Sequence, residues 1–242
     1  MSSLKNQLHR MLQRLCLAVP YLSEGRLATS RVLAFLRVWH YLSRNKIEGD
    51  YLEFGVWEGH SFDLSLRAAA KFLPGKSENG PRFFAFDSFK GLPSPDLQKD
   101  GNAFQEGEYK AALECFQRNI GKAARRFEVQ VVPGFYEESL TPDVISRFKL
   151  SKAAFVNIDC DLYDSTLCAL RFITPLLRTG SVIFFDDWFF SGGDMTRGEA
   201  GACAEWLKEN PQIKLIDFGI VGIMGQLFIV NQNEPATPSR PD

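Results

Sequence analysis

The chain alternates short apolar runs with helix-length segments, and this alternation limits its fold more than any other feature. Continuous apolarity predicts strands covered on both faces, and helical connectors make the first five strands parallel. The last two runs are separated by only five residues, which predicts an antiparallel hairpin. The expected fold is α/β: a doubly wound, seven-stranded, mostly parallel sheet with an antiparallel terminal strand. The seven runs are 51–56, 82–87, 127–133, 153–159, 181–187, 213–219 and 225–231.

The 242 residues, 45% of them hydrophobic, can bury one large core. We expect an N-terminal helical segment at 1–48, a catalytic α/β domain at 49–232 and a polar, disordered tail at 233–242. The first segment holds eight Lys and Arg against two Glu, so a basic amphipathic helix could lie on an anionic membrane. Packing against the domain, or against a second copy in a homo-oligomer, is the favoured interpretation.

A second helix is expected after an N-cap at Thr29 or Ser30. Its apolar side would be formed by Val32, Leu33, Phe35, Leu36, Trp39 and Leu42.

Composition excludes several partners. The net charge of −1 gives no overall field that would attract nucleic acid, so we expect none as a partner. No stretch approaches the roughly 20 apolar residues that span a bilayer. Five cysteines, an odd number without a CxxC pair, are typical of reduced thiols in a cytoplasmic protein. We therefore expect a soluble, cytoplasmic protein.

In open α/β sheets, ligands bind beyond the carboxyl ends of the strands. After the first run, Gly55 and Gly59 open a turn and Ser61 begins a helix, whose free N–H groups can bind a carboxylate or phosphate. Glu53 lies within an apolar strand, where a carboxylate needs a cationic partner such as a ligand's ammonium group. Many such turns serve only close packing, so this signal is weak alone.

Asp87 ends the second run, where an acidic residue commonly accepts hydrogen bonds from both hydroxyls of a ribose. The alternative is that Asp87 only caps the next turn through Ser88.

Acidic residues also follow the fourth and fifth runs. Asp159, Asp186 and Asp187 would repel one another at neighbouring strand ends unless a cation were bound, and oxygen ligands suit Mg²⁺. We predict these three as magnesium ligands and keep Asp161 as a further candidate. Asp161 or Asp164 could instead cap the helix expected to begin near Ser165.

Five ordered motifs between Gly49 and Trp188 resemble one family. They read GDYLEFGVWEGHS, FAFDSFKGLP, VVPGFYEESL, NIDCDLYDSTLCAL and VIFFDDW. This pattern is similar to that of the macrocin O-methyltransferases, which use S-adenosylmethionine to methylate sugar hydroxyls in natural product biosynthesis. The resemblance implies the Rossmann-like fold of class I methyltransferases and a hydroxylated, sugar-like acceptor.

The resemblance also assigns roles to residues. It implies that Glu53, Gly55 and Ser61 hold the methionine end of S-adenosylmethionine, and Asp87 and Ser88 its ribose. Gly134 and Phe135 would border the adenine. Asp159, Asp186 and Asp187 match the Mg²⁺ ligands, and Asp159 also matches the general base.

Two other functions stay open. The DCDLYDST stretch superficially matches the nucleophile loop of Mg²⁺-dependent phosphohydrolases through Asp159 and Asp161, although that loop normally follows a first strand. A non-catalytic nucleoside-binding protein is the other alternative. The polar segment Ser94–Lys110 is predicted to be a lid, or else an ordinary surface loop.

Overall fold

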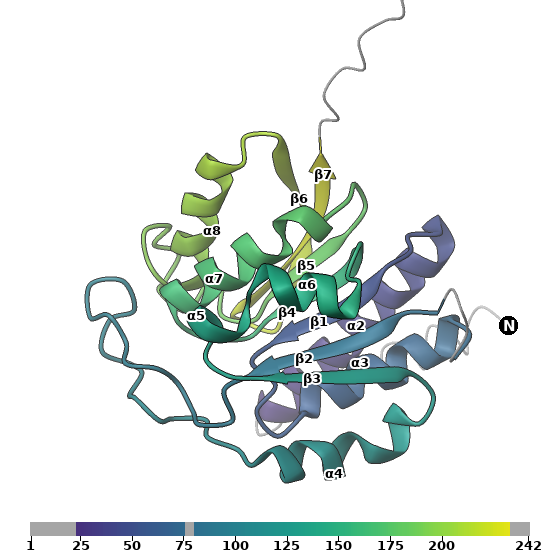
Figure 1. Cartoon of the computed structure of the whole chain (residues 1–242). Helices are drawn as coiled ribbons and strands as arrows, with labels where there is room; N and C mark the ends of the chain where they lie inside the picture. The colour runs from purple at the N-terminus through teal and green to yellow at the C-terminus, as the bar shows by residue number, and fades with distance from the viewer. Residues whose placement is uncertain (1–22, 76–79, 233–242) are drawn as a thin grey trace, which may run out of the picture.

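The structure, a computed structural model, describes residues 23–75 and 80–232 (Figure 1). It contains a seven-stranded sheet in the order β3-β2-β1-β4-β5-β7-β6. The pairs within β1 to β5 are parallel, and β7 is antiparallel to β5 and β6. The predicted sheet is confirmed. Its strands are β1 (Asp50–Phe54), β2 (Arg82–Asp87), β3 (Glu128–Pro133), β4 (Ala153–Ile158), β5 (Val182–Phe185), β6 (Ile213–Val221) and β7 (Gly225–Gln232).

Helices cover both faces of the sheet, which explains why its central strands β4 and β5 are buried along their whole length. Figure 1 shows α5, α6 and α7 in front of the sheet, and α2 and α3 behind it. One face is covered by α2 (Ser23–Asn45), α3 (His60–Phe72) and α4 (Leu113–Ala124). The other is covered by α5 (Tyr136–Ser139), α6 (Pro142–Phe148), α7 (Tyr163–Ile173) and α8 (Gly198–Glu209), with a 3-10 turn, Thr174–Leu176, after α7.

Aromatic side chains form much of the core on each face. Trp39 of α2 stacks on Phe83 of β2, with ring centroids 5.6 Å apart. On the opposite face Phe54 and Phe86, which are paired across β1 and β2, stack at 4.7 Å. Large buried rings fix the relative position of their elements through area and shape. The carboxyl ends of β1 and β2 are thus held side by side.

The strand order reverses between β1 and β4, which creates a crevice at the carboxyl ends of these two strands. The chain runs from β1 outward to β2 and β3, then returns to β4 and continues to β5 on the other side. The loops after β1 and β4 therefore leave the sheet next to each other, in opposite directions. This crevice holds the site described below.

The predicted start of the second helix is wrong. The helix α2 begins at Ser23, and Ser30 lies within it, where its hydroxyl accepts a hydrogen bond from the Gly222 N–H at 2.9 Å. Val32 and Leu33, which were predicted to belong to the apolar side, are exposed. The buried face consists of Ala34, Phe35, Val38, Trp39 and Leu42.

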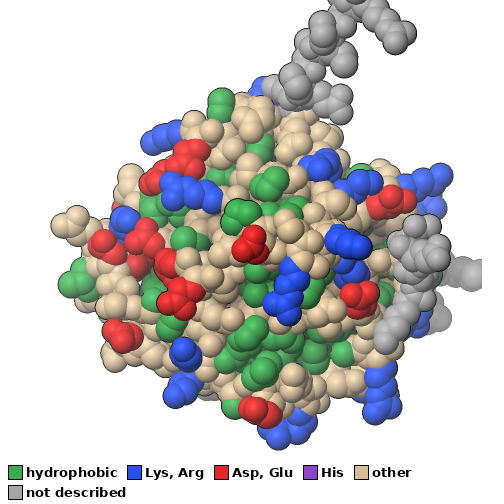
Figure 2. Space-filling view, viewed as in Figure 1, with side chains coloured by type: hydrophobic (Ala, Val, Ile, Leu, Met, Phe, Trp, Pro, Cys, Tyr) green, Lys and Arg blue, Asp and Glu red, His purple; other side chains and the backbone are tan. Residues whose placement is uncertain are grey.

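Some expectations lie outside the described residues, among them the amphipathic helix before Pro20 and the tail at 233–242. Among the helices that are described, none is long and apolar enough to cross a membrane. On the face seen in Figure 2, Lys and Arg side chains are interspersed with Asp and Glu. The basic side chains of this face do not form one continuous surface.

Candidate active site

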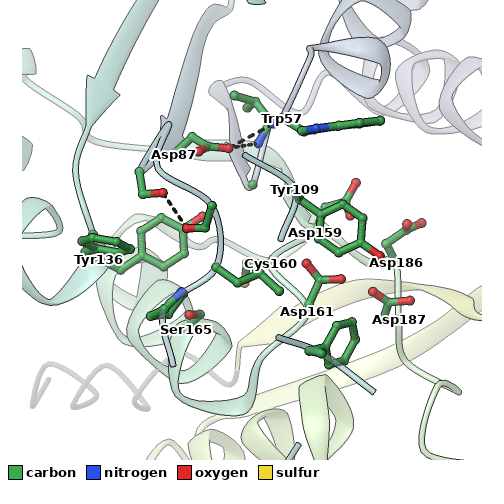
Figure 3. Close-up of a pocket in the computed structure, with 18 of the residues that line it drawn as sticks. Trp57, Asp87, Tyr109, Tyr136, Asp159, Cys160, Asp161, Ser165, Asp186 and Asp187 are labelled. Atoms are coloured by element: carbon green, nitrogen blue, oxygen red, sulfur yellow. Dashed lines mark hydrogen bonds between the residues drawn. The ribbon is translucent and has the colours of Figure 1, made fainter. Parts of the chain in front are cut away.

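A cavity of about 360 Å³ opens at the carboxyl ends of the parallel strands. The loops after all five of these strands contribute to its wall. Figure 3 shows Asp87 at one end of this cavity and Asp186 and Asp187 at another. The predicted residues that line it are Gly55, Ser61, Asp87, Ser88, Gly134, Phe135, Asp159, Asp186 and Asp187. Glu53 and Gly59 are not among its lining residues.

The turn after β1 depends on two glycines with positive φ. At Gly55 (φ 83°), a Cβ atom would lie 1.7 Å from the carbonyl oxygen of Asp159, so any side chain would force β1 and β4 apart. At Gly59 (φ 87°), a Cβ atom would meet the Phe116 ring at 2.8 Å. Gly55 thus lets the end of β1 pack closely against the end of β4, whereas Gly59 allows α3 to pack against α4.

Glu53 is fully buried behind the cavity wall and accepts hydrogen bonds from the hydroxyls of Tyr51 and Ser61. Burial raises the pKa of the Glu53 carboxyl to about 7, and the two hydroxyl donors partly oppose this rise. Ser61 does line the cavity, so the Glu53 carboxyl lies one hydrogen bond away from the cavity wall. The predicted contact between Glu53 and an ammonium group stays a prediction.

Asp87 organises two loops through backbone N–H groups. One carboxylate oxygen accepts from Val56 at 2.8 Å and Trp57 at 3.0 Å, and the other accepts from Phe89 at 2.7 Å. Ser88 is occupied in its own turn, where its hydroxyl donates to the Gly91 carbonyl at 2.8 Å. Asp87 therefore fixes the shape of the turn, as the capping alternative predicted, while it also lines the cavity.

Four aspartates gather at the ends of β4 and β5: Asp159, Asp161, Asp186 and Asp187 (Figure 3). Burial and the charge of Asp186 raise the pKa of Asp159 well above its ordinary value, while burial and the charge of Asp187 do the same for Asp161. Burial also raises the pKa of Asp187 to about 6. This cluster is therefore short of positive charge.

Arg31 supplies the positive charge within the cluster, and the sequence analysis missed it. Its Nη2 pairs with both carboxylate oxygens of Asp186, and its Nη1 lies 3.8 Å from Asp159 Oδ2. Its place on α2 separates it by more than 120 residues from its partners, so only the tertiary fold brings them together. The basic character of the first fifth of the chain was the only sequence signal.

Magnesium fits the donor set of this cluster in chemistry, because carboxylate oxygens are its preferred protein ligands. In the described ranges, however, no three His, Cys, Asp or Glu side chains are arranged so that they could hold a metal ion. The guanidinium of Arg31 lies against Asp186 and near Asp159, two of the predicted ligands. Metal binding by Asp159, Asp186 and Asp187 stays a prediction.

Glu199 is a buried carboxyl group next to the four aspartates. It is 1% exposed, at the start of α8, and its Oε2 accepts a hydrogen bond from the Asp187 N–H at 3.0 Å. Burial and the charge of Asp187 raise the pKa of the Glu199 carboxyl well above its ordinary value. Glu199 thus holds the backbone of the loop after β5. The sequence did not indicate this role, because Glu199 stands alone in a glycine-rich segment.

Aromatic side chains line the mouth of the cavity near the aspartates. Phe104 and Phe190 have ring centroids 4.9 Å apart, and Trp57 meets Tyr109 edge to face at 6.2 Å. Trp57, Tyr109 and Phe190 are also exposed, which is unusual for large rings. Trp57 lines the cavity, whereas Trp188 packs against Phe185 and Phe228.

The segment Ser94–Lys110 contributes Phe104 and Tyr109 to this mouth, and it is fastened at Asp100. Asp100 accepts a hydrogen bond from the Tyr163 N–H at 2.7 Å and thereby caps α7. The prediction that Asp161 or Asp164 caps this helix near Ser165 is wrong, because α7 starts at Tyr163 and takes its cap from a distant loop.

This sheet order, with a ligand cavity at the switch point, defines the class I methyltransferase fold, and solved structures agree. The O-methyltransferase NovP superposes with a TM-score of 0.60 and 21% identity over 83% of this chain and 79% of its own. CalS11, a calicheamicin methyltransferase, superposes with a TM-score of 0.66 and 17% identity over 90% and 85%.

The sequence gives the narrower assignment. A model of the family described as Macrocin-O-methyltransferase (TylF) matches residues 5–199. The chain belongs to the macrocin O-methyltransferase family, as the motifs predicted.

Two curated relatives are each 27% identical to the chain. One is the 8-demethyl-8-(2,3-dimethoxy-alpha-L-rhamnosyl)-tetracenomycin-C 4'-O-methyltransferase of Streptomyces olivaceus, over 59% of this chain and 54% of that protein. The other is the demethyldecarbamoylnovobiocin O-methyltransferase of Streptomyces niveus, over 60% and 54%. The chain thus spans about half the length of the curated relatives it matches.

Proposed function

We propose that the protein is an S-adenosylmethionine-dependent O-methyltransferase that acts on a hydroxyl of a sugar or another polyhydroxylated small molecule. One observation carries this proposal: a single cavity contains Asp87 at one end and the aspartate cluster at another. The first suits a ribose, and the second suits the deprotonation of an acceptor hydroxyl. Family membership and the sugar-modifying relatives support the same reading.

The residues present fit the cofactor. Gly55 lines the cavity without a side chain, and Ser61 stands at the start of α3, where free N–H groups can bind a carboxylate. Asp87 keeps lone pairs for ribose hydroxyls beside its three N–H partners. Gly134 and Phe135 line the wall proposed for the adenine, next to Ser88. S-adenosylmethionine would supply an electrophilic methyl group.

The chain's own residues would then position the acceptor and take its proton. Asp159 lines the cavity between the turn after β1 and the aspartates of β5, so we assign it the general base. Burial and the charge of Asp186 raise the pKa of Asp159, and the nearby Arg31 guanidinium partly opposes this rise. The rings of Phe104, Tyr109 and Phe190 would pack on the apolar face of the acceptor and exclude water from the hydroxyl.

Asp159, Asp186 and Asp187 are the residues proposed to hold Mg²⁺. Such an ion would acidify a bound hydroxyl and stabilise the alkoxide. The phosphohydrolase alternative loses support, because Asp159 and Asp161 share their cavity with Asp87 and the glycine turn, which that reaction does not require.

Calorimetric titration with S-adenosylhomocysteine tests this function. We expect micromolar binding by the wild type and a loss of about tenfold or more in Asp87→Ala, because three N–H groups lose their acceptor and the loop changes shape. Glu114→Ala, which removes an exposed carboxylate on α4, is the charge-matched control and should bind like the wild type. Absence of binding by the wild type would overturn the proposal. Turnover on a panel of glycosides would then separate an enzyme from a nucleoside-binding protein.

A further inference from the structure

We propose that Glu53 is a positioning residue that acts as a neutral acid: its proton is donated to Ser61, and the Ser61 hydroxyl in turn donates to the carboxylate at the methionine end of the cofactor. This inference rests on the proposed function and deepens it, since it says how the chain recognises that carboxylate. Glu53 does not line the cavity, so its influence on a ligand passes through Ser61. This role differs from the direct contact with an ammonium group that the sequence predicted.

The Ser61 hydroxyl is the link between Glu53 and the cavity. Its Oγ is in hydrogen-bond contact with Glu53 Oε1, and Ser61 also lines the cavity. A hydroxyl has one hydrogen, so it can donate either to Glu53 or to a ligand, but not to both. An ionised Glu53 takes this hydrogen. A Glu53 that keeps its own proton instead fills the contact between the two oxygens itself and leaves the Ser61 hydrogen for the ligand.

Tyr51 determines which oxygen of Glu53 carries the proton. Its hydroxyl donates to Glu53 Oε2, and burial raises the pKa of Tyr51 well above its ordinary value, so Tyr51 stays a donor. Its ring is fully buried and packs against the rings of Phe62 and Phe155, which fix its position. Because a carboxylic acid accepts chiefly through its carbonyl oxygen, Oε2 is that oxygen, and the proton lies on Oε1, facing Ser61.

The surroundings of Glu53 favour its neutral form. Glu53 is fully buried, and this burial raises the pKa of its carboxyl to about 7. The charge of Arg31 on α2 opposes the rise less than the neighbouring hydroxyls do, since the guanidinium lies against Asp186. The groups that face Glu53 from β1, α3 and β4 are neutral: Tyr51, Ser61 and Asn157. A ligand carboxylate beside Ser61 adds negative charge and favours the neutral acid further.

The position of Ser61 suits a carboxylate. Ser61 is the second residue of α3, and the N–H groups in the first turn of a helix lack partners within the helix and carry partial positive charge. A donating Ser61 hydroxyl adds one more donor beside them. An accepting hydroxyl would instead turn its lone pairs toward the carboxylate and repel it. The neutral state of Glu53 therefore makes the hydroxyl and the helix act together.

Calorimetric titration with S-adenosylhomocysteine at pH 6 and pH 8 tests this role without any variant. The wild type should bind about tenfold more weakly at pH 8, because a pKa of about 7 leaves roughly a tenth of Glu53 protonated there. Titrations at pH 8 in buffers of different ionisation enthalpy should show the uptake of nearly one proton on binding. Equal affinity at the two pH values, or release of a proton, would overturn the proposal.

Glu53→Gln separates positioning from a merely structural role. A glutamine accepts from Tyr51 through its carbonyl oxygen and donates to Ser61 through its amide, so it reproduces the neutral acid at every pH. This variant should match the wild type at pH 6 and bind about tenfold more tightly than the wild type at pH 8. Weakening of its binding with pH to the same extent as in the wild type would contradict the role of Glu53.

Ser61→Ala removes the link and leaves Glu53 in place. It should bind S-adenosylhomocysteine about tenfold more weakly than the wild type at pH 6, the usual loss for a hydrogen bond to a charged group. Its affinity should not fall further at pH 8, since Glu53 can no longer act on the ligand. A variant that kept the wild-type dependence on pH would show that Ser61 does not transmit the effect and would overturn the proposal.

Two controls exclude other titrating groups. His60→Gln removes the imidazole next to Ser61, which also lines the cavity, and this variant should keep the wild-type change with pH. Decarboxylated S-adenosylhomocysteine, which keeps the amine, should bind the wild type equally at both pH values and without proton uptake. Loss of the pH dependence in His60→Gln, or the same dependence with the decarboxylated ligand, would assign the effect to another group and reject the proposal.

The same titrations separate this inference from the proposed function. Binding of S-adenosylhomocysteine that is equal at pH 6 and pH 8 would retain the methyltransferase and reject the role of Glu53. Absence of binding at both pH values would reject the methyltransferase and this inference together.

Discussion

Two arginine–aspartate ion pairs lie at opposite ends of the strands, one at the amino ends (the amino edge) and one at the carboxyl ends (the carboxyl edge). They differ in how many of the hydrogen-bonding groups of the aspartate and the arginine have a partner. At the amino edge, Asp50 of β1 accepts from the backbone N–H, Nε and Nη2 of Arg82 at 3.1, 3.1 and 2.6 Å. The same guanidinium donates to the Phe148 carbonyl at 2.6 Å and lies over the Phe84 ring. At the carboxyl edge, Arg31 holds Asp186 through one nitrogen while other carboxylates surround it.

The difference indicates that an ion pair supports the fold when neither of its two side chains has another charged group to pair with. Asp50 is 7% exposed, and all of its nearby donors belong to Arg82, so removal of either side chain leaves a buried group unpaired. Asp186 lies among three more aspartates that line the same cavity, and its partner Arg31 is shared with Asp159. The Asp50–Arg82 pair therefore supports the fold, whereas the Arg31–Asp186 pair lies in the proposed active site.

Turnover should show the largest difference between the two edges. Asp159→Asn removes the proton acceptor and should lower kcat by about 10² to 10⁴-fold, the usual contribution of a general base. Initial rates of methyl transfer at saturating cofactor measure this effect. Asp50→Asn, measured as folded protein, should keep the wild-type kcat. An Asp159→Asn variant that retained more than a tenth of the turnover would remove Asp159 from the base role.

Stability should show the reverse order. Asp50→Asn leaves Arg82 without its partner and should lower the free energy of unfolding by about 3 kcal/mol, as for other buried pairs. Asp186→Asn relieves repulsion within the cluster and should change it by less than about 1 kcal/mol. Urea denaturation of both variants at neutral pH makes the comparison. Equal losses in the two variants would mean that the Arg31 pair is also structural.

The pH dependence of stability should report the titration of Glu53, which lies behind the cavity wall. Glu53 has a pKa of about 7 in the folded protein, above its ordinary value of 4.5, so the folded state keeps a proton that the unfolded chain releases. The stability that this proton gives is present below pH 4.5 and is lost as the pH rises to about 7, by at most about 3 kcal/mol.

In Glu53→Gln the side chain is a neutral amide that does not titrate. The variant should therefore gain stability relative to the wild type between pH 4.5 and 8. Urea denaturation of both proteins at several pH values measures the difference, and Glu128→Gln, at an exposed position on β3, controls for other titrating groups. A constant difference between wild type and Glu53→Gln across this range would contradict the shifted pKa.

The sheet could be predicted well because each buried strand appears in the sequence as its own short apolar run. The run 82–87 coincides with β2, and 153–159 exceeds β4 by one residue, since apolar residues on both faces mark a covered strand wherever it occurs. The glycine turn and the strand-end aspartates could be found for the same reason. Each follows a strand directly, and the fold then brings them together at one edge.

The missed residues depend on contacts between distant segments. Nothing near Arg31 in the sequence indicates an acidic partner, and nothing near Asp100 indicates that it caps α7. The start of α2 was misplaced because Thr29 and Ser30 are common caps, whereas Ser30 hydrogen-bonds a turn almost two hundred residues away. Local patterns determined the elements, but the pairings that complete the site come from tertiary structure.

The cap that Asp100 gives to α7 has a consequence for how acceptor preference can change. The loop that carries Phe104 and Tyr109 cannot lift at Asp100 without releasing the helix next to Asp161. Beyond this anchor, the stretch from Asn102 to Gly107 is mostly exposed, so insertions and substitutions there cost little stability. Residues 102–109 are therefore a suitable region to randomise in directed evolution toward new acceptors. Asp100 should be kept constant, so that α7 and the aspartates beside it keep their positions while the residues at the mouth of the cavity vary.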